Sequence, residues 1–225
     1  AVIRDTLEGR LGRTRILEES LGLSARGIFD RARAVTLVAC GTSYYAASVA
    51  RYWIEALTGI PATAEIASEF RYRQPAVPAD TLLVTLSQSG ETADTLAALR
   101  ASRERPYLSR LAICNVPESS LVRESDRVLM TRAGVEVGVA STKAFTTQLV
   151  ALMLLTLCIG QAQSLAPEEV ARIVTDLRSL PQQVERVLAL EPAVAALAPR
   201  LVHRDHALFL GRGVEYPIAL EGALK

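Results

Sequence analysis

The segment 82–99 most constrains what this chain can fold into, because an apolar run ends there in small hydroxyl residues before a helical pattern begins (LLVTL, SQSGET, ADTLAAL). Leu96 and Leu99 fall on one face of that helix. The order is therefore strand, turn and helix. Ser89 is expected to cap the helix, and Gly90 lets the backbone approach a ligand closely.

A turn of this kind can hold an anion. The first N–H groups of a helix lack intrahelical acceptors and lie at the positive end of the helix dipole. The hydroxyl groups of Ser87, Ser89 and Thr92 beside them would form a neutral cup that suits a phosphate group. For one such turn alone, an ordinary strand-to-helix turn with a serine cap is the alternative.

The pattern recurs twice. The apolar run 34–40 leads into Thr42 and Ser43 and then into a helix, while Ser141 and Thr142 follow a loop and are expected to cap a long apolar helix. In open α/β sheets, ligands bind outside the carboxyl ends of the strands. Three such helix starts therefore favour one polar ligand that is held at several points.

Composition excludes several classes of protein. Half of the 225 residues are hydrophobic, which predicts a globular chain with a sizeable core. The 25 basic and 24 acidic residues are well mixed, and no basic stripe indicates nucleic-acid binding. Residues 1–10 lack the apolar core of a signal peptide, and the most apolar stretch, 149–159, is too short to span a bilayer.

The cysteine and histidine residues do not form a metal-binding pattern. Cys40, Cys114 and Cys158 lie in or at the end of apolar segments, no CxxC occurs, and the histidines are His203 and His206. A structural zinc site is not expected. Buried reduced thiols in a cytoplasmic protein explain the cysteines, although Cys40, which ends a strand beside the expected site, could instead be a nucleophile.

Strand and helix patterns alternate through the first two thirds of the chain, which predicts an α/β fold: a three-layer αβα, doubly wound parallel sheet. Residues 3–29 read as helical and precede this alternation. Strands are expected at 34–40, 62–67, 82–87, 109–114 and 127–131. Helices are expected at 43–57, 68–72, 91–104, 119–124 and 142–160.

The remaining third reads differently. Residues 167–190 form a charged helical pattern that Pro181 interrupts, and a further helical piece follows. The ALFL run at 207–210 reads as a new buried strand, with a helix from about Tyr216. We expect a helical linker and the start of a second α/β unit, in a fragment that lacks the rest of that unit.

Six segments together resemble one known family, the glutamine–fructose-6-phosphate aminotransferases (isomerizing glucosamine-6-phosphate synthases), in their isomerase domain. LSQSGET alone would indicate only a sugar isomerase (SIS) domain. The segments are CGTS (40–43), EIASEFRYR (65–73), LSQSGETADTL (86–96), AICNVPESSLVRESD (112–126), GVASTKAFTTQL (138–149) and LGRGVEYPIALEGALK (210–225).

The resemblance implies a flavodoxin-like SIS fold that occurs twice in the complete isomerase portion. It divides the chain into an N-terminal helical segment (1–30), a first SIS, phosphosugar-binding domain (31–165), a helical linker (166–203) and the truncated beginning of a second SIS domain (204–225).

The resemblance also assigns site residues. The phosphate of the hexose phosphate would be held by Ser43, Ser87, Gln88, Ser89 and Thr92, and the sugar would face Thr42, the backbone of Val139, and Ser141. Glu221 and Lys225 match family positions in or next to the catalytic helix, with Lys225 assisting proton transfer. Without the resemblance, these two residues read as a surface ion pair, because they are four apart on one helix face.

The implied reaction transfers ammonia from glutamine to fructose 6-phosphate and yields glucosamine 6-phosphate. It is acid–base and imine chemistry that requires no metal or cofactor. The implied partners are these sugar phosphates, a second copy of the chain in a homodimer, and the glutaminase domain and second SIS half of the parent enzyme, with no nucleic acid or membrane. We expect this piece to bind the hexose phosphate and to be inactive alone.

Three other interpretations stay open. The chain could be a non-catalytic phosphosugar-binding module or another SIS enzyme, such as a deglycase or a ketose/aldose isomerase. A nucleotide-binding Rossmann protein is disfavoured, since neither GxGxxG nor a P-loop sequence occurs. The polar run 71–73 could be solvated surface or a subunit contact.

Overall fold

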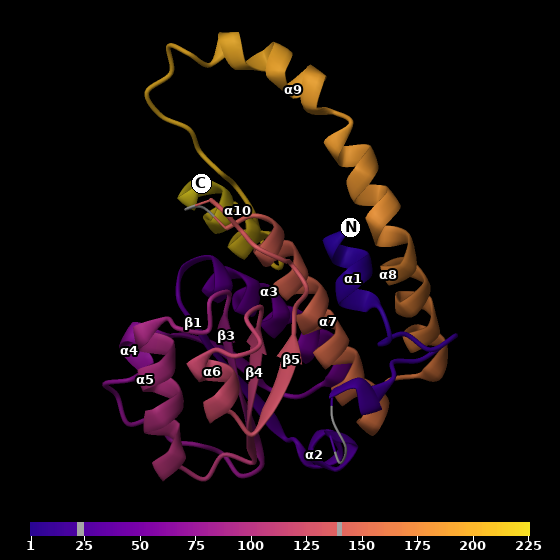
Figure 1. Cartoon of the computed structure of the whole chain (residues 1–225), viewed down its shortest axis with the longest axis vertical. Helices are drawn as coiled ribbons and strands as arrows, with labels where there is room; N and C mark the ends of the chain where they lie inside the picture. Colours follow the sequence, from indigo (N-terminus) through magenta and orange to yellow (C-terminus); the bar gives the residue numbers. More distant parts are fainter. Residues whose placement is uncertain (22–24, 139–140) are drawn as a thin grey trace.

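Five parallel strands form one sheet in the order β2-β1-β3-β4-β5, which is the flavodoxin-like order of doubly wound proteins (Figure 1). The computed structural model describes residues 1–21, 25–138 and 141–225. Each strand lies within two residues of its predicted bounds. The strands are β1 (Ala34–Ala39), β2 (Ala62–Ile66), β3 (Thr81–Ser87), β4 (Ser109–Cys114) and β5 (Arg127–Met130).

Helices cover both faces of the sheet, as the predicted three layers require. On one face, Val35 and Leu37 pack with α3 (Gly41–Thr58) and α7 (Lys143–Gln163). On the other face, Val38 packs against α4 (Ala67–Phe70) and α5 (Ala93–Ala101), and residues of β4 pack against α6 (Ser120–Glu124). Successive strand residues point to opposite faces, so strands covered on both sides read as continuous apolar runs.

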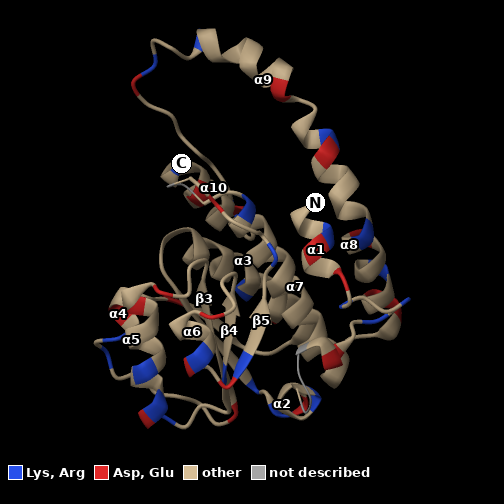
Figure 2. Ribbon diagram, viewed as in Figure 1, with Lys and Arg blue, Asp and Glu red and all other residues tan. Residues whose placement is uncertain are grey.

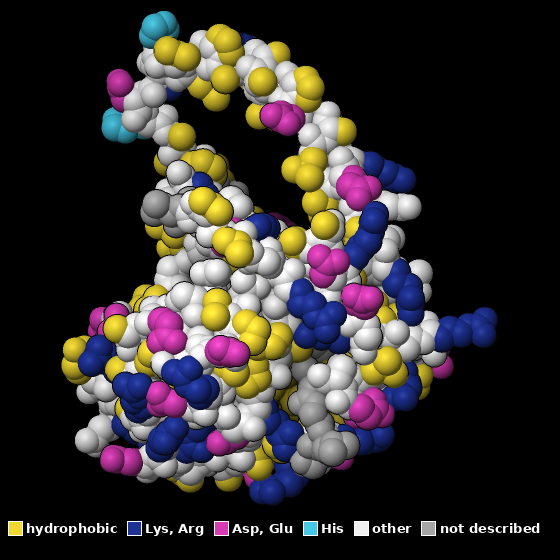
Figure 3. Space-filling model, in the orientation of Figure 1, with side chains coloured by type: hydrophobic (Ala, Val, Ile, Leu, Met, Phe, Trp, Pro, Cys, Tyr) yellow, Lys and Arg dark blue, Asp and Glu magenta, His cyan; other side chains and the backbone are white. Residues whose placement is uncertain are grey.

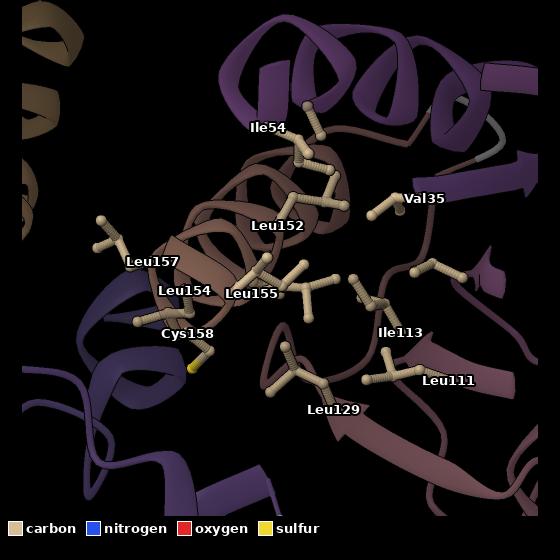
Figure 4. Close-up of a cluster of buried hydrophobic side chains, with 14 of the residues drawn as sticks. Val35, Ile54, Leu111, Ile113, Leu129, Leu152, Leu154, Leu155, Leu157 and Cys158 are labelled. Carbon is tan, nitrogen blue, oxygen red and sulfur yellow. The ribbon is translucent and has the colours of Figure 1, made fainter. Parts of the chain in front are cut away.

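The helix α7 forms the centre of the larger core. Leu155 of α7 points toward Ile113 of the sheet, and Leu152 lies between Ile54 of α3 and Val35 of β1 (Figure 4). With 21 residues, α7 is longer than the apolar stretch in the sequence, and it is long and apolar enough to cross a membrane. However, 72% of its most apolar window is buried inside the molecule, as in the core helix of a globular protein.

The N-terminal segment is less helical than predicted. The helix α1 (Val2–Leu7) ends before Gly9, whose φ of +74° suits a turn, and Leu11 then pairs with Ile16 in an antiparallel bridge. The short helix η1 (Glu18–Leu21) and α2 (Ala25–Arg31) follow. Hydrogen bonds to α7 hold the bridge, because the Gln161 side chain accepts from the Ile16 N–H at 3.0 Å.

After α7 the chain stays on the core through Val170 and Val174, and from about residue 185 it leaves the body of the molecule as an arch (Figure 1). The helix α8 (Pro167–Leu188) continues through Pro181, so the predicted interruption is absent there. The arch then comprises α9 (Glu191–Leu197) and the short helix η3 (Ala198–Arg200), and the chain returns to α10 (Glu215–Leu224), which packs on α3.

The predicted strand at 207–210 is wrong. This segment has no regular secondary structure and pairs with no strand in the part of the chain that the structure describes, and the Leu208 side chain is 88% exposed. An apolar run becomes a strand only when a partner supplies its hydrogen bonds. Figure 3 shows the arch with hydrophobic side chains in yellow, standing away from the body.

Acidic and basic residues are interspersed along the ribbon, as the balanced composition predicts (Figure 2). Arg100 of α5 and Glu124 of α6, for example, form two hydrogen bonds of 2.9 and 2.6 Å. On the face drawn in Figure 3, basic and acidic side chains lie next to one another.

Candidate functional site

The carboxyl ends of β1 and β3 bring two of the predicted hydroxyl clusters to one edge of the sheet. Val38 of β1 pairs with Thr85 of β3, so Cys40 and Ser87 both lie two residues beyond this pair. The strand order reverses between these two strands, and crevices for ligands occur at such switch points.

The turn after β3 is an internally bonded loop of hydroxyl groups. The Ser87 hydroxyl oxygen accepts from the Gly90 N–H at 2.9 Å and lies 3.0 Å from the Thr92 hydroxyl. The Ser89 hydroxyl accepts from the Glu91 N–H at 3.1 Å, and Ser89 itself is exposed. The prediction that Ser89 caps the helix is wrong, because α5 begins at Ala93 and has Thr92 as its N-cap residue, without a side-chain cap bond.

Gly90 explains why the turn is so tight. Its φ of +68° is in the left-handed region, and a Cβ atom there would lie 2.0 Å from the Ser119 hydroxyl oxygen and 2.8 Å from the Cys114 sulfur. The backbone of the turn therefore lies directly against the loop that follows β4. Only glycine fits both the conformation and the space.

The start of α3 carries the second cluster. Cys40 is the N-cap residue, so Thr42 and Ser43 lie in the first turn, where backbone N–H groups lack intrahelical partners. The Ser43 hydroxyl oxygen accepts from the Gln148 side-chain amide of α7 at 2.9 Å, and the Thr42 hydroxyl donates to Glu221 of α10 at 3.1 Å.

Glu221 and Lys225 form the i,i+4 ion pair of the alternative interpretation, but the pair also joins this cluster and its Glu221 end is buried. Glu221 is only 5% exposed, and its Oε1 lies 2.8 Å from the Lys225 Nζ. The same ammonium donates to the Thr42 hydroxyl at 3.4 Å and to the backbone carbonyl of Ser141. Among the described residues, the second Glu221 oxygen, Oε2, is buried and has no hydrogen-bond partner.

The third predicted helix start is organised by a residue that the sequence reasoning missed, Glu136. Its Oε1 accepts from the N–H groups of Thr142 and Ala144 at 2.8 and 3.3 Å, and its Oε2 accepts from the Ser141 hydroxyl at 3.0 Å. Thr142 is the N-cap residue of α7, as predicted, but neither its side chain nor that of Ser141 makes a cap bond, because the Glu136 carboxylate accepts from the Thr142 and Ala144 N–H groups instead. An acidic residue in the loop before a helix was the available signal.

Glu136 is held as a carboxylate. Burial raises the pKa of Glu136. The hydrogen bonds from the Thr142 and Ala144 N–H groups and from the neighbouring hydroxyls together lower it by more, so its pKa lies below the usual value. Because this carboxylate already occupies the positive end of α7, an anionic ligand can bind only at the helix starts after β1 and β3 within this group of three.

The remaining predicted residues are placed as follows. Gln88 is half-buried within the turn after β3, and Val139 lies outside the described residues. Among the residues the structure describes, no hydrogen bond links Ser87 or Thr92 directly to the Thr42–Glu221–Lys225 group. The hydroxyl turn after β3 and the Thr42–Glu221–Lys225 group therefore lie at the same edge of the sheet but form separate hydrogen-bond networks.

The cysteines and histidines lie in different parts of the described structure. Cys40 is half-buried beside the site, whereas His203 and His206 are exposed on the arch. Cys114 and Cys158 are buried, and burial raises the pKa of the Cys158 thiol well above its usual value. Within the described ranges, no three His, Cys, Asp or Glu side chains are close enough together to hold a metal ion.

The sequence is similar to known proteins along its whole length. It is 59% identical over 226 residues to a glutamine–fructose-6-phosphate aminotransferase (isomerizing) of Pseudomonas aeruginosa, covering 100% of this chain and 37% of the relative. A protein of the same name from Haemophilus influenzae is 53% identical, covering 98% and 36%. The chain thus spans little more than a third of these relatives, and the resemblance noted from the motifs is confirmed.

Solved structures agree with the fold. The C-terminal domain of glucosamine-fructose-6-phosphate aminotransferase from Francisella tularensis superposes with a TM-score of 0.96 at 46% identity, covering 99% of this chain and 63% of that one. A tagatose-6-phosphate ketose/aldose isomerase from Escherichia coli shares the fold, with a TM-score of 0.68 at 22% identity over 89% of this chain and 56% of that one. The sequence model of the SIS domain matches residues 28–158, and the chain therefore belongs to the SIS domain family.

Proposed function

We propose that this chain is the phosphosugar-binding part of an enzyme that converts fructose 6-phosphate and glutamine into glucosamine 6-phosphate and glutamate. The observation that carries the proposal is the hydroxyl turn after β3 at the same sheet edge as the Thr42–Glu221–Lys225 group. The relatives of that name, similar along the whole chain, support this substrate class.

The turn after β3 and the first turn of α3 would hold the phosphate. N–H groups at helix starts and neutral hydroxyls bind anions without a counter-charge that must be displaced. The proposed residues are Ser43, Ser87, Gln88, Ser89 and Thr92. Phosphate binding far from the reacting carbons supplies energy that can orient the sugar for proton transfer.

Glu221 and Lys225 would face the sugar together with Thr42, Ser141 and the backbone of Val139. A buried carboxylate with one unpartnered oxygen can accept a proton or a hydroxyl hydrogen bond, and the adjacent ammonium can stabilise a developing negative charge. We assign both residues to proton transfer between adjacent carbons of the open sugar.

The remaining parts of the assembly are proposed from the resemblance. Residues 31–165 would form the first SIS domain and 204–225 the beginning of a second one, with 1–30 and 166–203 as helical segments. A glutaminase domain and a second SIS half would complete the enzyme, which we place in the cytoplasm as a homodimer. We expect the 225 residues to bind hexose 6-phosphates and not to catalyse the synthesis.

Calorimetric titration tests the phosphate site. Glucosamine 6-phosphate is titrated into the chain and into a Ser89→Ala, Thr92→Ala double variant. Loss of two hydroxyl donors to a charged group should weaken binding by about 3 kcal/mol, or roughly a hundredfold. A matched Ser179→Ala, Thr175→Ala variant on α8 should bind as the parent does.

Equal affinity of the parent and the Ser89→Ala, Thr92→Ala variant would place the phosphate elsewhere. Synthesis of glucosamine 6-phosphate by the 225 residues alone would contradict the expectation that this chain is inactive without the other domains. Binding without turnover, lost with the two hydroxyls, is the expected result.

A further inference from the structure

A glutamine side chain lies inside the core helix directly behind the proposed phosphate site. Gln148 of α7 is only 2% exposed, and its Nε2 donates to the hydroxyl oxygen of Ser43 at 2.9 Å. The two residues are 105 positions apart in the sequence, so the contact depends on the packing of α7 against α3.

This hydrogen bond determines in which direction the Ser43 hydroxyl group can donate its hydrogen. A serine hydroxyl has one hydrogen and two lone pairs, whereas a side-chain NH₂ group can only donate. Because Gln148 uses a lone pair of the Ser43 oxygen, the hydroxyl hydrogen cannot point at Gln148 and is available for another acceptor. A phosphate dianion offers only acceptors, so it needs this orientation.

The other end of the Gln148 side chain argues against a purely structural role. Its Oε1 is buried and has no hydrogen-bond partner among the residues that the structure describes, which costs stability relative to an apolar side chain of the same size. The neighbours one turn away on α7, Ala144 and Leu152, are buried and apolar. A methionine would therefore suit the packing better than glutamine does.

We propose that Gln148 is a positioning residue that turns the Ser43 hydroxyl hydrogen toward the phosphate of the bound sugar. The proposal rests on the proposed function, because it assumes that Ser43 faces the phosphate. It goes beyond that function by assigning a role to a buried side chain that does not contact the ligand.

The test compares Gln148→Met and Gln148→Glu with the parent chain. Binding of glucosamine 6-phosphate is measured by calorimetry, and stability is measured by urea unfolding. Gln148→Met should weaken binding about three- to tenfold while the urea midpoint stays the same or rises. Gln148→Glu should weaken binding more, because a carboxylate accepts the Ser43 hydrogen and repels the phosphate.

Two controls separate positioning from packing. In a Ser43→Ala background, Gln148→Met should change the affinity no further, since the hydroxyl that it orients is gone. Gln161 on the same helix has both amide ends bonded, to Ile16 and Glu18. Gln161→Met should therefore lower the urea midpoint and leave sugar phosphate binding unchanged.

The outcomes are distinct. If Gln148→Met leaves the affinity unchanged, or if affinity and stability fall together, the positioning role is overturned while the phosphate site stands. If Ser43→Ala has no effect on affinity, or the parent binds no sugar phosphate, the site itself is wrong and the positioning role falls with it.

Discussion

The hydroxyl groups around the proposed site differ in what their oxygens and hydrogens are free to do. Ser43 accepts from Gln148, and Ser89 accepts from a backbone N–H, so both hydrogens remain available for an anion. Ser141 instead donates its hydrogen to Glu136. At the scale of single residues, the hydrogen-bond partner behind each hydroxyl decides whether that hydroxyl can bind a phosphate.

Replacing Gly90 should damage the turn after β3. Gly90→Ala places a methyl group against Ser119 and Cys114 at positive φ, so we expect a loss of about 2–5 kcal/mol in the free energy of unfolding. Gly59 is the matched control, because its φ is also +68° but no atom lies within 4 Å of its Cβ position. Gly59→Ala should cost only about 1–2 kcal/mol.

Urea unfolding of both variants, together with sugar phosphate titration, checks this prediction. We expect Gly90→Ala to lose binding and Gly59→Ala to keep it. Equal losses in the two variants would mean that the close approach of the turn to Ser119 does not contribute to the free energy of unfolding.

Glu136 should contribute stability that depends on pH. The pKa of Glu136 is lower in the folded chain than in the unfolded chain, so its contribution is complete above the usual carboxyl pKa of about 4.3. That contribution disappears as the pH falls through the lower, folded value. Glu136→Gln should therefore cost about 1 kcal/mol at pH 7 and progressively less below pH ~4.

Thermal unfolding between pH 3 and pH 7 measures this difference between the parent and Glu136→Gln. The exposed Glu8 serves as the comparison through Glu8→Gln, because its carboxylate lies 3.8 Å from the Arg132 guanidinium and accepts no backbone hydrogen bond among the described residues. A constant difference in Tm across the pH range would contradict the role of the Glu136 carboxylate at the start of α7.

At the scale of elements, the apolar strands and α7 form the part of the fold that the rest depends on. All seven residues of β3 are buried, and α7 lies in the core with α1, α2 and α3 packed against it. The second half of α8 carries exposed Val187 and Leu188 instead. Helices of similar length therefore contribute very differently to stability.

Truncation of leucines on these two helices measures the contrast. Leu155→Ala removes a fully buried side chain of α7 that points toward the sheet and should cost about 2–5 kcal/mol (Figure 4). Leu188→Ala removes a side chain that is 67% exposed and should change the free energy of unfolding by less than about 0.5 kcal/mol. Chemical denaturation of both variants is the measurement, and similar costs would contradict the placement of α7 as the core helix.

At the scale of the whole molecule, the arch after α8 is the part with the least tertiary support. Every residue from 185 to 213 is exposed, and several of these residues carry large apolar side chains. Only α10 brings the chain back, by packing on α3. Such a surface is typical of a segment that another protein surface covers.

Limited trypsin digestion should cut the arch first. Arg200, Arg204 and Arg212 lie in exposed chain with little regular structure, whereas Arg10 is buried and bonded to backbone carbonyls. Mass spectrometry of early products should show cleavage between 200 and 212. A variant with glutamine at these three arginines should be cut more slowly, and first cuts within the sheet domain would contradict the prediction.

Much of the fold was predictable because its elements carry local signals. Strands covered on both faces read as apolar runs, and Gly90 with its hydroxyl neighbours made the turn after β3 predictable. The strand predicted at 207–210 had the same local signal and is wrong, since a strand requires a partner that no local pattern supplies. The site residues near β1 and β3 were predictable to the extent that they follow those strands.

Local patterns in the amino-acid sequence were enough to predict the five strands of the sheet, the positions of the hydroxyl turns and the family. Packing of the helices was needed to place Glu136 at the start of α7, Gln148 beside Ser43, and Glu221 in a buried position against Thr42. The physical reason is the range of the interactions. Periodicity and turn propensities act over a few residues, whereas a hydrogen bond across 105 or 179 positions exists only after the helices have packed.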